Sequence, residues 1–158
     1  MDAQDAIYFE DLEVGHETRS PSRTLTETDI VNFAGLSGDF HELHMDAEFA
    51  RKTPFGQRIA HGLLGLSMAS GLVTRLPGVS RHQFVAFLGM TWDFRLPLFI
   101  GDTIHAVQTV SEKRATKKPG LGVVVYDVKV VNQNGDVCQE GQWKTMYMMR
   151  HAAPPDSE

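Results

Sequence analysis

Apolar and polar residues follow two rhythms along this chain, a helical one in the first half and a strand-like one in the second. Ile30 and Ala34 recur at helical spacing shortly after Thr26, and Asp29 stands three positions beyond that threonine. A hydroxyl residue followed three positions later by an acid is typical of a capped helix start. The pattern therefore predicts a helix from about Thr26 that ends at the glycines near Gly38.

Two further helices are predicted before the second half of the chain. Asp46 is expected to cap a short helix that stops before Pro54, because a residue preceding proline disfavours the helical conformation. Residues 62–76 form a run in which leucines cover several faces and small residues keep the rest thin. A helix that is apolar all round is expected to be buried. This third helix should therefore lie inside a sheet that wraps around it.

The second half of the chain is rich in β-branched and aromatic residues, which favour strands. Four strands are expected there and a fifth one earlier in the chain, at residues 84–94, 103–110, 123–131, 137–149 and about 17–24. Short connections, with a type I′ hairpin signal at Asn134 and Gly135, predict an antiparallel meander. We therefore expect an α+β domain over residues 1–150, with about five strands in a curved sheet around the long helix, and a frayed tail over residues 151–158.

Composition and charge limit the class of protein. The chain has 158 residues, one cysteine (Cys138) and a net charge of −5. This length suits one domain, which buries roughly 70% of its unfolded surface and needs no disulfide. A lone cysteine fits a cytoplasmic location, and the negative charge argues against nucleic acid as a partner. The acidic N-terminus does not look like a signal peptide, and residues 62–76 fall short of the roughly 18 residues of a membrane span, so no membrane partner is expected.

The candidate chemistry gathers between the first and third predicted helices. Asp39 and His44 lie five positions apart in a predicted loop, and His61 and Gly62 open the long helix. A carboxylate and an imidazole on one loop can share a water molecule and exchange protons with it. Imidazole suits this role because its pKa lies near neutrality. The first N–H groups of a helix have no partner inside the helix, so the Gly62 N–H could stabilise a developing negative charge.

Each of these residues also has a structural explanation. Asp39 could shape a turn, His44 could be a hydrogen-bonded structural histidine, and His61 could brace the loop. Asp46 is explained better as a helix cap than as a catalyst. Ser70 could be no more than a small residue on a packed helix.

Several possible metal ligands also stand close together in this segment, namely Asp39, His41, His44, Asp46 and His61. They lack the helical HExxH spacing of zinc enzymes, and no cysteine accompanies them. We therefore expect no metal.

This segment resembles the MaoC-like dehydratase family, and within it the (R)-specific enoyl-CoA hydratases. The family's loop reads Gly-Asp-x-Asn-Pro-x-His-x-Asp, followed by Phe-Gly and then by Ile-x-His-Gly. The corresponding pieces here are residues 38–46, 55–56 and 59–62. Further similarity at residues 8–15, 94–97 and 101–102 extends the resemblance over nearly the whole chain.

The resemblance implies a hot-dog fold, in which a curved antiparallel sheet wraps a long central helix. It also implies at least a homodimer, with the acyl chain in a tunnel near the subunit interface. The implied reaction is reversible hydration of a trans-2-enoyl thioester to the (R)-3-hydroxyacyl product. Asp39 and His44 then activate water, the Gly62 N–H polarises the thioester carbonyl, and Ser70 and His61 support the pair. No separate cofactor is implied, because coenzyme A or an acyl carrier protein is part of the substrate.

The sequence departs from the family at His41 and Glu42, where asparagine and proline are usual. An extra imidazole and an extra acid beside the site can shift the pKa of Asp39 or His44. Two alternatives stay open: a thioesterase of the same fold that hydrolyses acyl-CoA, and a non-catalytic subunit that binds acyl thioesters.

Overall fold

A computed structural model describes residues 6–150, so the tail predicted over residues 151–158 lies outside the described residues. The described part of the chain forms one antiparallel sheet of six strands in the order β1, β4, β5, β6, β3, with β2 paired to β4. The strands are β1 Glu17–Arg19, β2 Arg23–Thr24, β3 Phe84–Phe94, β4 Thr103–Ala115, β5 Leu121–Val131 and β6 Val137–Met148. The helices are α1 Glu27–Ser37, α2 Glu42–Met45, α3 Ala47–Arg51 and α4 Gly62–Val73.

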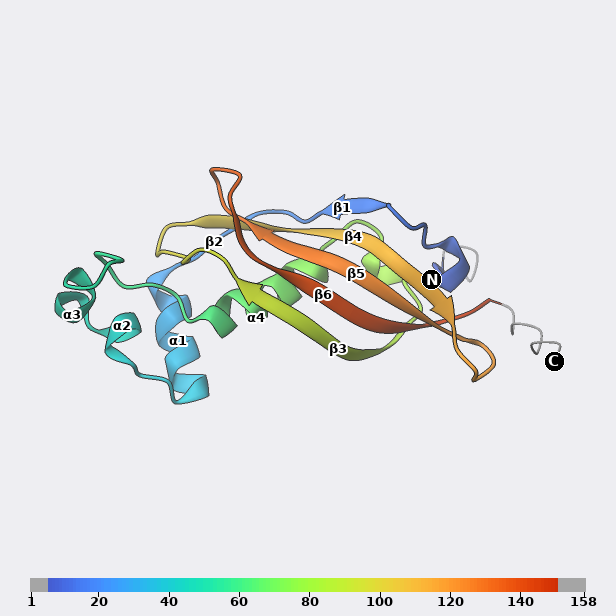
Figure 1. Cartoon of the computed structure of the whole chain (residues 1–158), viewed down its shortest axis with the longest axis horizontal. Coiled ribbons are helices and arrows are strands. Elements are labelled where there is room, and N and C mark those ends of the chain that lie inside the picture. The colour runs from blue at the N-terminus through green and yellow to red at the C-terminus, as the bar shows by residue number, and fades with distance from the viewer. Residues whose placement is uncertain (1–5, 151–158) are drawn as a thin grey trace.

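The sheet curves around α4, which lies on its concave side (Figure 1). Met68, Ala69 and Leu72 of α4 are buried and share one core with sheet residues such as Ile104 and Val128. Burial of apolar surface is the dominant favourable term in folding, and it offsets the low helix propensity of the glycines in α4. The expected hot-dog arrangement, a curved sheet around a central helix, is confirmed.

The first strand differs from the prediction because proline interrupts it. Pro21 has no N–H to donate, and the strand expected over residues 17–24 is divided into β1 and β2. Ser20 bridges the break, since its Oγ accepts the Ala106 N–H at 2.9 Å and donates to the Pro21 carbonyl at 2.8 Å. The described sheet therefore has six strands in place of the expected five.

The long helix ends earlier than residue 76, the predicted end. α4 stops at Val73, and the Thr74 Oγ1 donates to the Gly71 carbonyl at 2.7 Å. Because Pro77 disfavours a helical conformation at Leu76, residues 74–76 form a turn and a bend instead.

The hairpin between β5 and β6 is not of type I′, contrary to the prediction. That turn needs a positive φ at both central residues, but Gly135 has a φ of +87° and Asn134 is not positive. Residues 132–136 form a longer loop, in which the Asn132 N–H donates to the Asp136 carbonyl at 3.0 Å. The Asn132 Oδ1 also accepts the N–H groups of Asn134 and Asp136, at 2.9 and 3.0 Å, which fixes the loop.

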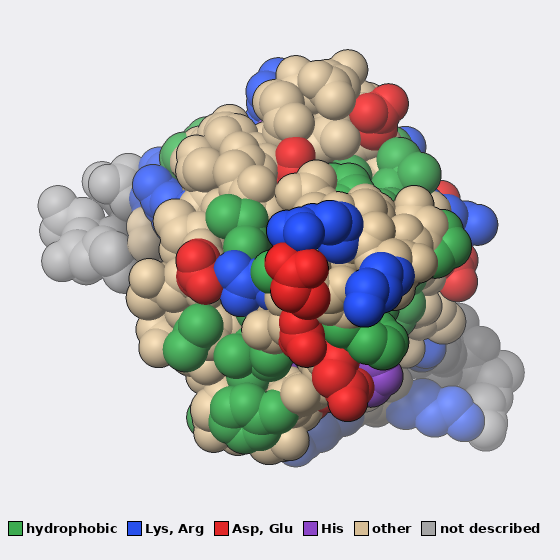
Figure 2. Space-filling model, turned by 90° about the vertical axis from the view of Figure 1, so that its left-hand side faces the viewer, with side chains coloured by type: hydrophobic (Ala, Val, Ile, Leu, Met, Phe, Trp, Pro, Cys, Tyr) green, Lys and Arg blue, Asp and Glu red, His purple; other side chains and the backbone are tan. Residues whose placement is uncertain are grey.

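Helices α1, α2 and α3 lie together beyond the end of the sheet where α4 begins (Figure 1). Acidic and basic side chains both lie on this end of the molecule (Figure 2), where Arg51 pairs with Glu48 and Arg58 pairs with Glu27. Among the described residues, no helix has both the length and the hydropathy needed to cross a membrane.

Candidate active site

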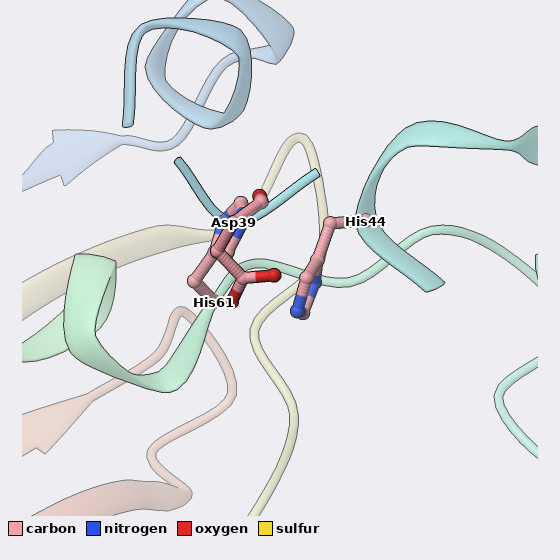
Figure 3. Close-up of side chains that lie close together, drawn as sticks. All are labelled: Asp39, His44 and His61. Carbon is pink, nitrogen blue, oxygen red and sulfur yellow. The ribbon is translucent and has the colours of Figure 1, made fainter. Parts of the chain in front are cut away.

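Three of the predicted residues converge where the helical end of the molecule meets α4. Asp39, His44 and His61 each offer a ligand atom, and these atoms all lie within 4.8 Å of one another (Figure 3). Asp39 comes from the α1–α2 loop, His44 from α2 and His61 from the residue before α4. The fold therefore brings together residues that are up to 22 positions apart in sequence.

The end of α1 places Asp39. Gly38 adopts the left-handed conformation, with a φ of +78°, and its N–H donates to the Ala34 carbonyl at 2.8 Å. This is a common way for a helix to end. Asp39 Oδ1 then accepts the His41 N–H at 3.2 Å, as in an Asx turn. The side chain of Asp39 is exposed and its carboxylate points toward His44 (Figure 3), so shaping the turn leaves it available for chemistry.

His44 lies on a short helix and not in the loop that the sequence predicted. The imidazole of His41 caps this helix, because its Nδ1 accepts the Leu43 N–H at 3.1 Å. His41 thus replaces the usual asparagine with another side chain that can accept a backbone hydrogen bond. Met45 is the last residue of α2, so His44 lies in its only turn, and its ring is half-buried.

The hydrogen bond of His44 defines which of its nitrogens is available. His44 Nδ1 lies 2.8 Å from the Ile59 carbonyl. A carbonyl oxygen can only accept, so Nδ1 carries the proton and donates it, while Nε2 keeps its lone pair. Nε2 is therefore the nitrogen that can accept a proton from water.

The surroundings of His44 favour the neutral ring. Burial is the largest cause and lowers the pKa of His44 below its ordinary value of 6.5, against the raising effect of the Ile59 carbonyl. His61 and His41 lower the pKa further, whereas the Asp39 carboxylate raises it. A neutral imidazole at pH 7 has the lone pair that a general base needs.

His61 braces both members of the pair. It is buried, with 3% of its surface exposed, and its Nε2 donates to the Asp39 carbonyl at 2.9 Å. Its ring stacks on His44, with 3.8 Å between the ring centroids and 29° between the ring planes. The bracing role expected for His61 thus has a geometric basis, although its side chain does not cap α4.

The same stacking argues against a metal site. A metal ion lies in the plane of each imidazole that binds it, so two ligand rings must turn their edges toward one point. The rings of His44 and His61 instead lie nearly face to face, with 29° between their planes. The closeness of the three side chains is therefore better suited to proton transfer than to coordination.

Gly62 lies beside this pair and opens onto the same cavity as His44. The cavity has a volume of about 510 Å³ and is walled largely by apolar side chains, among them Phe55, Leu63 and Phe94. Gly62 is the first residue of α4, and among the described residues its N–H has no hydrogen-bond partner. A Cβ at this position would lie 2.8 Å from the Phe94 ring. Glycine therefore lets the exposed Phe94 ring lie against the start of α4 and leaves the backbone accessible.

The structure does not bring Ser70 to the pair within one chain. Ser70 lies on α4, eight residues after Gly62, which corresponds to about 12 Å along the helix axis. It lines a second cavity of about 320 Å³ together with Val73 and Trp143. Asp46, by contrast, is the helix cap that the sequence predicted, because its Oδ1 accepts the Glu48 N–H at 2.8 Å.

Sequence reasoning missed Gln139, a buried residue of β6 that lines the cavity with His44 and Gly62. No motif marks it, because it stands in a strand and far from the loop in sequence. A polar residue among the apolar positions of β6 is the signal that could have found it.

Comparisons with known proteins find a matching family and several relatives. The family described as MaoC like domain matches residues 11–132. A 3-hydroxybutyryl-CoA dehydratase of Methylorubrum extorquens is 40% identical over 67% of this chain, which spans 65% of that protein. An (R)-specific enoyl-CoA hydratase of Rhodospirillum rubrum is 39% identical over 75% of this chain and 81% of its own length. A solved structure from Archaeoglobus, described as a monoamine oxidase regulatory protein, has a TM-score of 0.85 and 39% identity, and covers 94% of this chain and 97% of that one.

Proposed function

This chain belongs to the MaoC-like domain family, and we propose that it reversibly hydrates a trans-2-enoyl-CoA, or a related enoyl thioester, to the (R)-3-hydroxyacyl thioester. One observation carries the proposal: the carboxylate of Asp39 lies close to His44, and His44 lines a cavity with Gly62, whose N–H has no hydrogen-bond partner among the described residues. This combination offers two proton acceptors for one water molecule and one donor for an oxyanion.

The reaction begins with a water molecule held between Asp39 and His44. The water oxygen forms a bond to C3 while the pair accepts one of its protons. The electrons of the C2=C3 bond move toward the thioester, whose carbonyl oxygen becomes negatively charged. The Gly62 N–H, at the positive end of the α4 dipole, stabilises this charge.

The second step returns the proton. The enolate collapses and C2 takes from the pair the proton that water gave up, so Asp39 and His44 end the cycle in their starting states. Addition of both groups from the side of the pair is syn. The reverse sequence dehydrates a 3-hydroxyacyl thioester by the same contacts, and no cofactor takes part.

The test is a direct assay of crotonyl-CoA hydration by loss of enoyl absorbance, with the product stereochemistry measured. Asp39→Asn keeps the size and the turn-forming oxygen of the side chain but removes the proton acceptor. We expect its rate to fall roughly 100-fold or more. A near wild-type rate in Asp39→Asn contradicts the proposal, and release of free thiol from acyl-CoA without loss of the enoyl group identifies a thioesterase instead.

The proposed active form is a homodimer. β3 stands at one edge of the described sheet and carries exposed apolar side chains, including Val85, Leu88 and Met90. Exposed apolar edges of this kind favour pairing with another strand. A two-fold pairing of β3 with its copy makes the two α4 helices antiparallel, which carries Ser70 toward the partner's helix start and supports its expected role.

Dimerisation and the role of Ser70 are tested separately from catalysis. Leu88→Asp should shift the sedimenting species from dimer to monomer, because a charge on a paired apolar edge is costly. Ser70→Ala should lower the hydration rate without that shift. A monomeric wild type contradicts the dimer. We propose further that the acyl group of the substrate is carried by coenzyme A or by an acyl carrier protein. We also propose that the protein acts in the cytoplasm.

A further inference from the structure

Two glycines on α4 have different surroundings, and the difference points to Gln139. A Cβ built on Gly65 would lie 2.2 Å from Nε2 of Gln139, so the bare backbone of α4 makes room for this side chain. A Cβ built on Gly71, about 1.7 turns further along the same helix, would meet nothing within 4 Å. The Gln139 side chain therefore occupies the space beside Gly65, whereas the space beside Gly71 is open.

The amide of Gln139 connects the sheet to the first residue of α4. Gln139 has 3% of its surface exposed, and its Nε2 donates to the Gly62 carbonyl at 3.2 Å. Its Oε1 accepts the indole N–H of Trp92, on β3, at 3.1 Å. An indole N–H can only donate and a carbonyl can only accept, so the amide has one satisfied orientation. Trp92 thereby directs the Gln139 N–H toward Gly62.

The start of α4 needs such an anchor. The side chain of His61, at the N-cap, makes no capping hydrogen bond. The first turn also contains two glycines, Gly62 and Gly65, which lower helix propensity and allow the end of a helix to fray. A hydrogen bond from Gln139 of β6 holds Gly62 by its carbonyl.

We infer that Gln139 is a positioning residue for the proposed hydration, oriented by Trp92 and acting through Gly62. It holds the first residue of α4 so that the Gly62 N–H faces the substrate carbonyl in the cavity. The inference rests on the proposed function, because it concerns the oxyanion donor of that reaction. Gln139 itself does not contact the reacting atoms in this scheme.

The experiment disturbs this link in two independent ways. Gln139→Met keeps the length and volume of the side chain but removes both hydrogen bonds, and Gly65→Ala pushes the amide away without changing it. A displaced catalytic group costs roughly tenfold to a hundredfold in rate. We expect a loss of that size in kcat for crotonyl-CoA in both variants, with KM nearly unchanged, because the oxyanion forms in the transition state.

Matched controls separate positioning from general structural damage. Gly71→Ala makes the same substitution on the same helix with no neighbour to displace, and it should keep the wild-type kcat. Gln108→Met removes another buried glutamine of the sheet, on β4, where the side chain lies away from Gly62. It should lose far less kcat than Gln139→Met does. Equal losses of kcat in both glutamine variants overturn the inference.

A spectroscopic readout tests the link without turnover. Butyryl-CoA has no double bond to hydrate, and the infrared stretch of its bound thioester carbonyl reports the hydrogen bond from Gly62. Gln139→Met, Gly65→Ala and the milder Trp92→Phe should each move this stretch back toward the free-ligand frequency. If Gln139→Met and Gly65→Ala both leave the carbonyl stretch and kcat unchanged, and the wild type hydrates crotonyl-CoA, the positioning role is wrong but the proposed function is not. If the wild type binds butyryl-CoA but does not hydrate crotonyl-CoA, the proposed function is wrong. The inference about Gln139 is then wrong as well, because it rests on that function.

Discussion

The two ends of α4 both bury polar groups, but they use them differently. At its start, His44 keeps Nε2 available and Gly62 keeps its N–H available, both beside one cavity. Near its other end, the hydroxyl of Tyr126 donates to the hydroxyl of Tyr147 at 3.0 Å, and both residues are buried. Hydrogen-bonding capacity is thus left over at the start of α4, whereas the two tyrosine hydroxyls near its other end bond to each other.

The difference separates a reactive polar group from a structural one. Burial raises the pKa of Tyr126, and the neighbouring Tyr147 raises it further, so this hydroxyl stays protonated at any ordinary pH. Burial also raises the pKa of Tyr147. The pKa of His44 is moved in the direction that frees a lone pair near neutrality. Burial shifts the pKa values of groups at both ends of α4, and their hydrogen bonds determine which group can exchange protons.

The largest expected effect is the loss of activity in His44→Gln. Glutamine can still bond to the Ile59 carbonyl, but it has no basic nitrogen, so hydration of crotonyl-CoA should fall roughly 100-fold or more. The melting temperature should change little, because the ring is half-buried and the substitute is polar. If His44→Gln keeps the wild-type hydration rate, His44 is not the reacting group, and the start of α4 no longer differs from the tyrosine end in reactivity.

The tyrosine end should respond in the opposite way. Tyr126→Phe removes a buried hydroxyl and leaves Tyr147 without its donor, which is expected to cost about 1–3 kcal/mol of unfolding free energy. The hydration rate per folded molecule should stay near that of the wild type. Denaturant unfolding and crotonyl-CoA turnover, measured on the same preparation, show whether Tyr126→Phe loses stability and keeps its hydration rate. A large drop in kcat here means that the tyrosine pair serves catalysis.

The pH dependence of stability should come from three histidines together. The pKa values of His44, His82 and His105 are all lowered in the folded protein, with burial as the largest cause in each. As pH falls through 6.5, the unfolded chain takes up protons that the folded one does not, so stability decreases. The loss should end below the lowered folded values. Urea unfolding from pH 7.5 downward checks this, and a stability that rises on acidification contradicts it.

The smallest expected effect is a shift in the pH profile of the rate. His61 lowers the pKa of His44, so His61→Asn should raise it, and the acid limb of the hydration profile should move to higher pH. His16→Asn, a change at an exposed histidine outside the site, is the matched control. An acid limb that does not move shows that stacking on His61 does not tune His44.

Much of the site was predictable from residue types and spacing. Asp39, His44 and Gly62 were identified from a loop pattern and a helix start, and the capping box of Thr26 and Asp29 is confirmed. Local errors arose where a single backbone property decided the outcome. Pro21 divided a strand, Pro77 shortened α4, and Asn134 did not adopt the positive φ that a type I′ turn requires.

The sequence by itself determined most of the elements, the presence of a buried face on α4 and the chemical groups near its start, because these depend on periodicity and on residues close together in the chain. Only the tertiary structure decided which nitrogen of His44 is available, how His61 stacks on it, and that Gln139 reaches Gly62 from a strand 77 residues away. These features depend on distances between elements, and such distances are set by packing of the whole core. A pattern along the chain does not contain them.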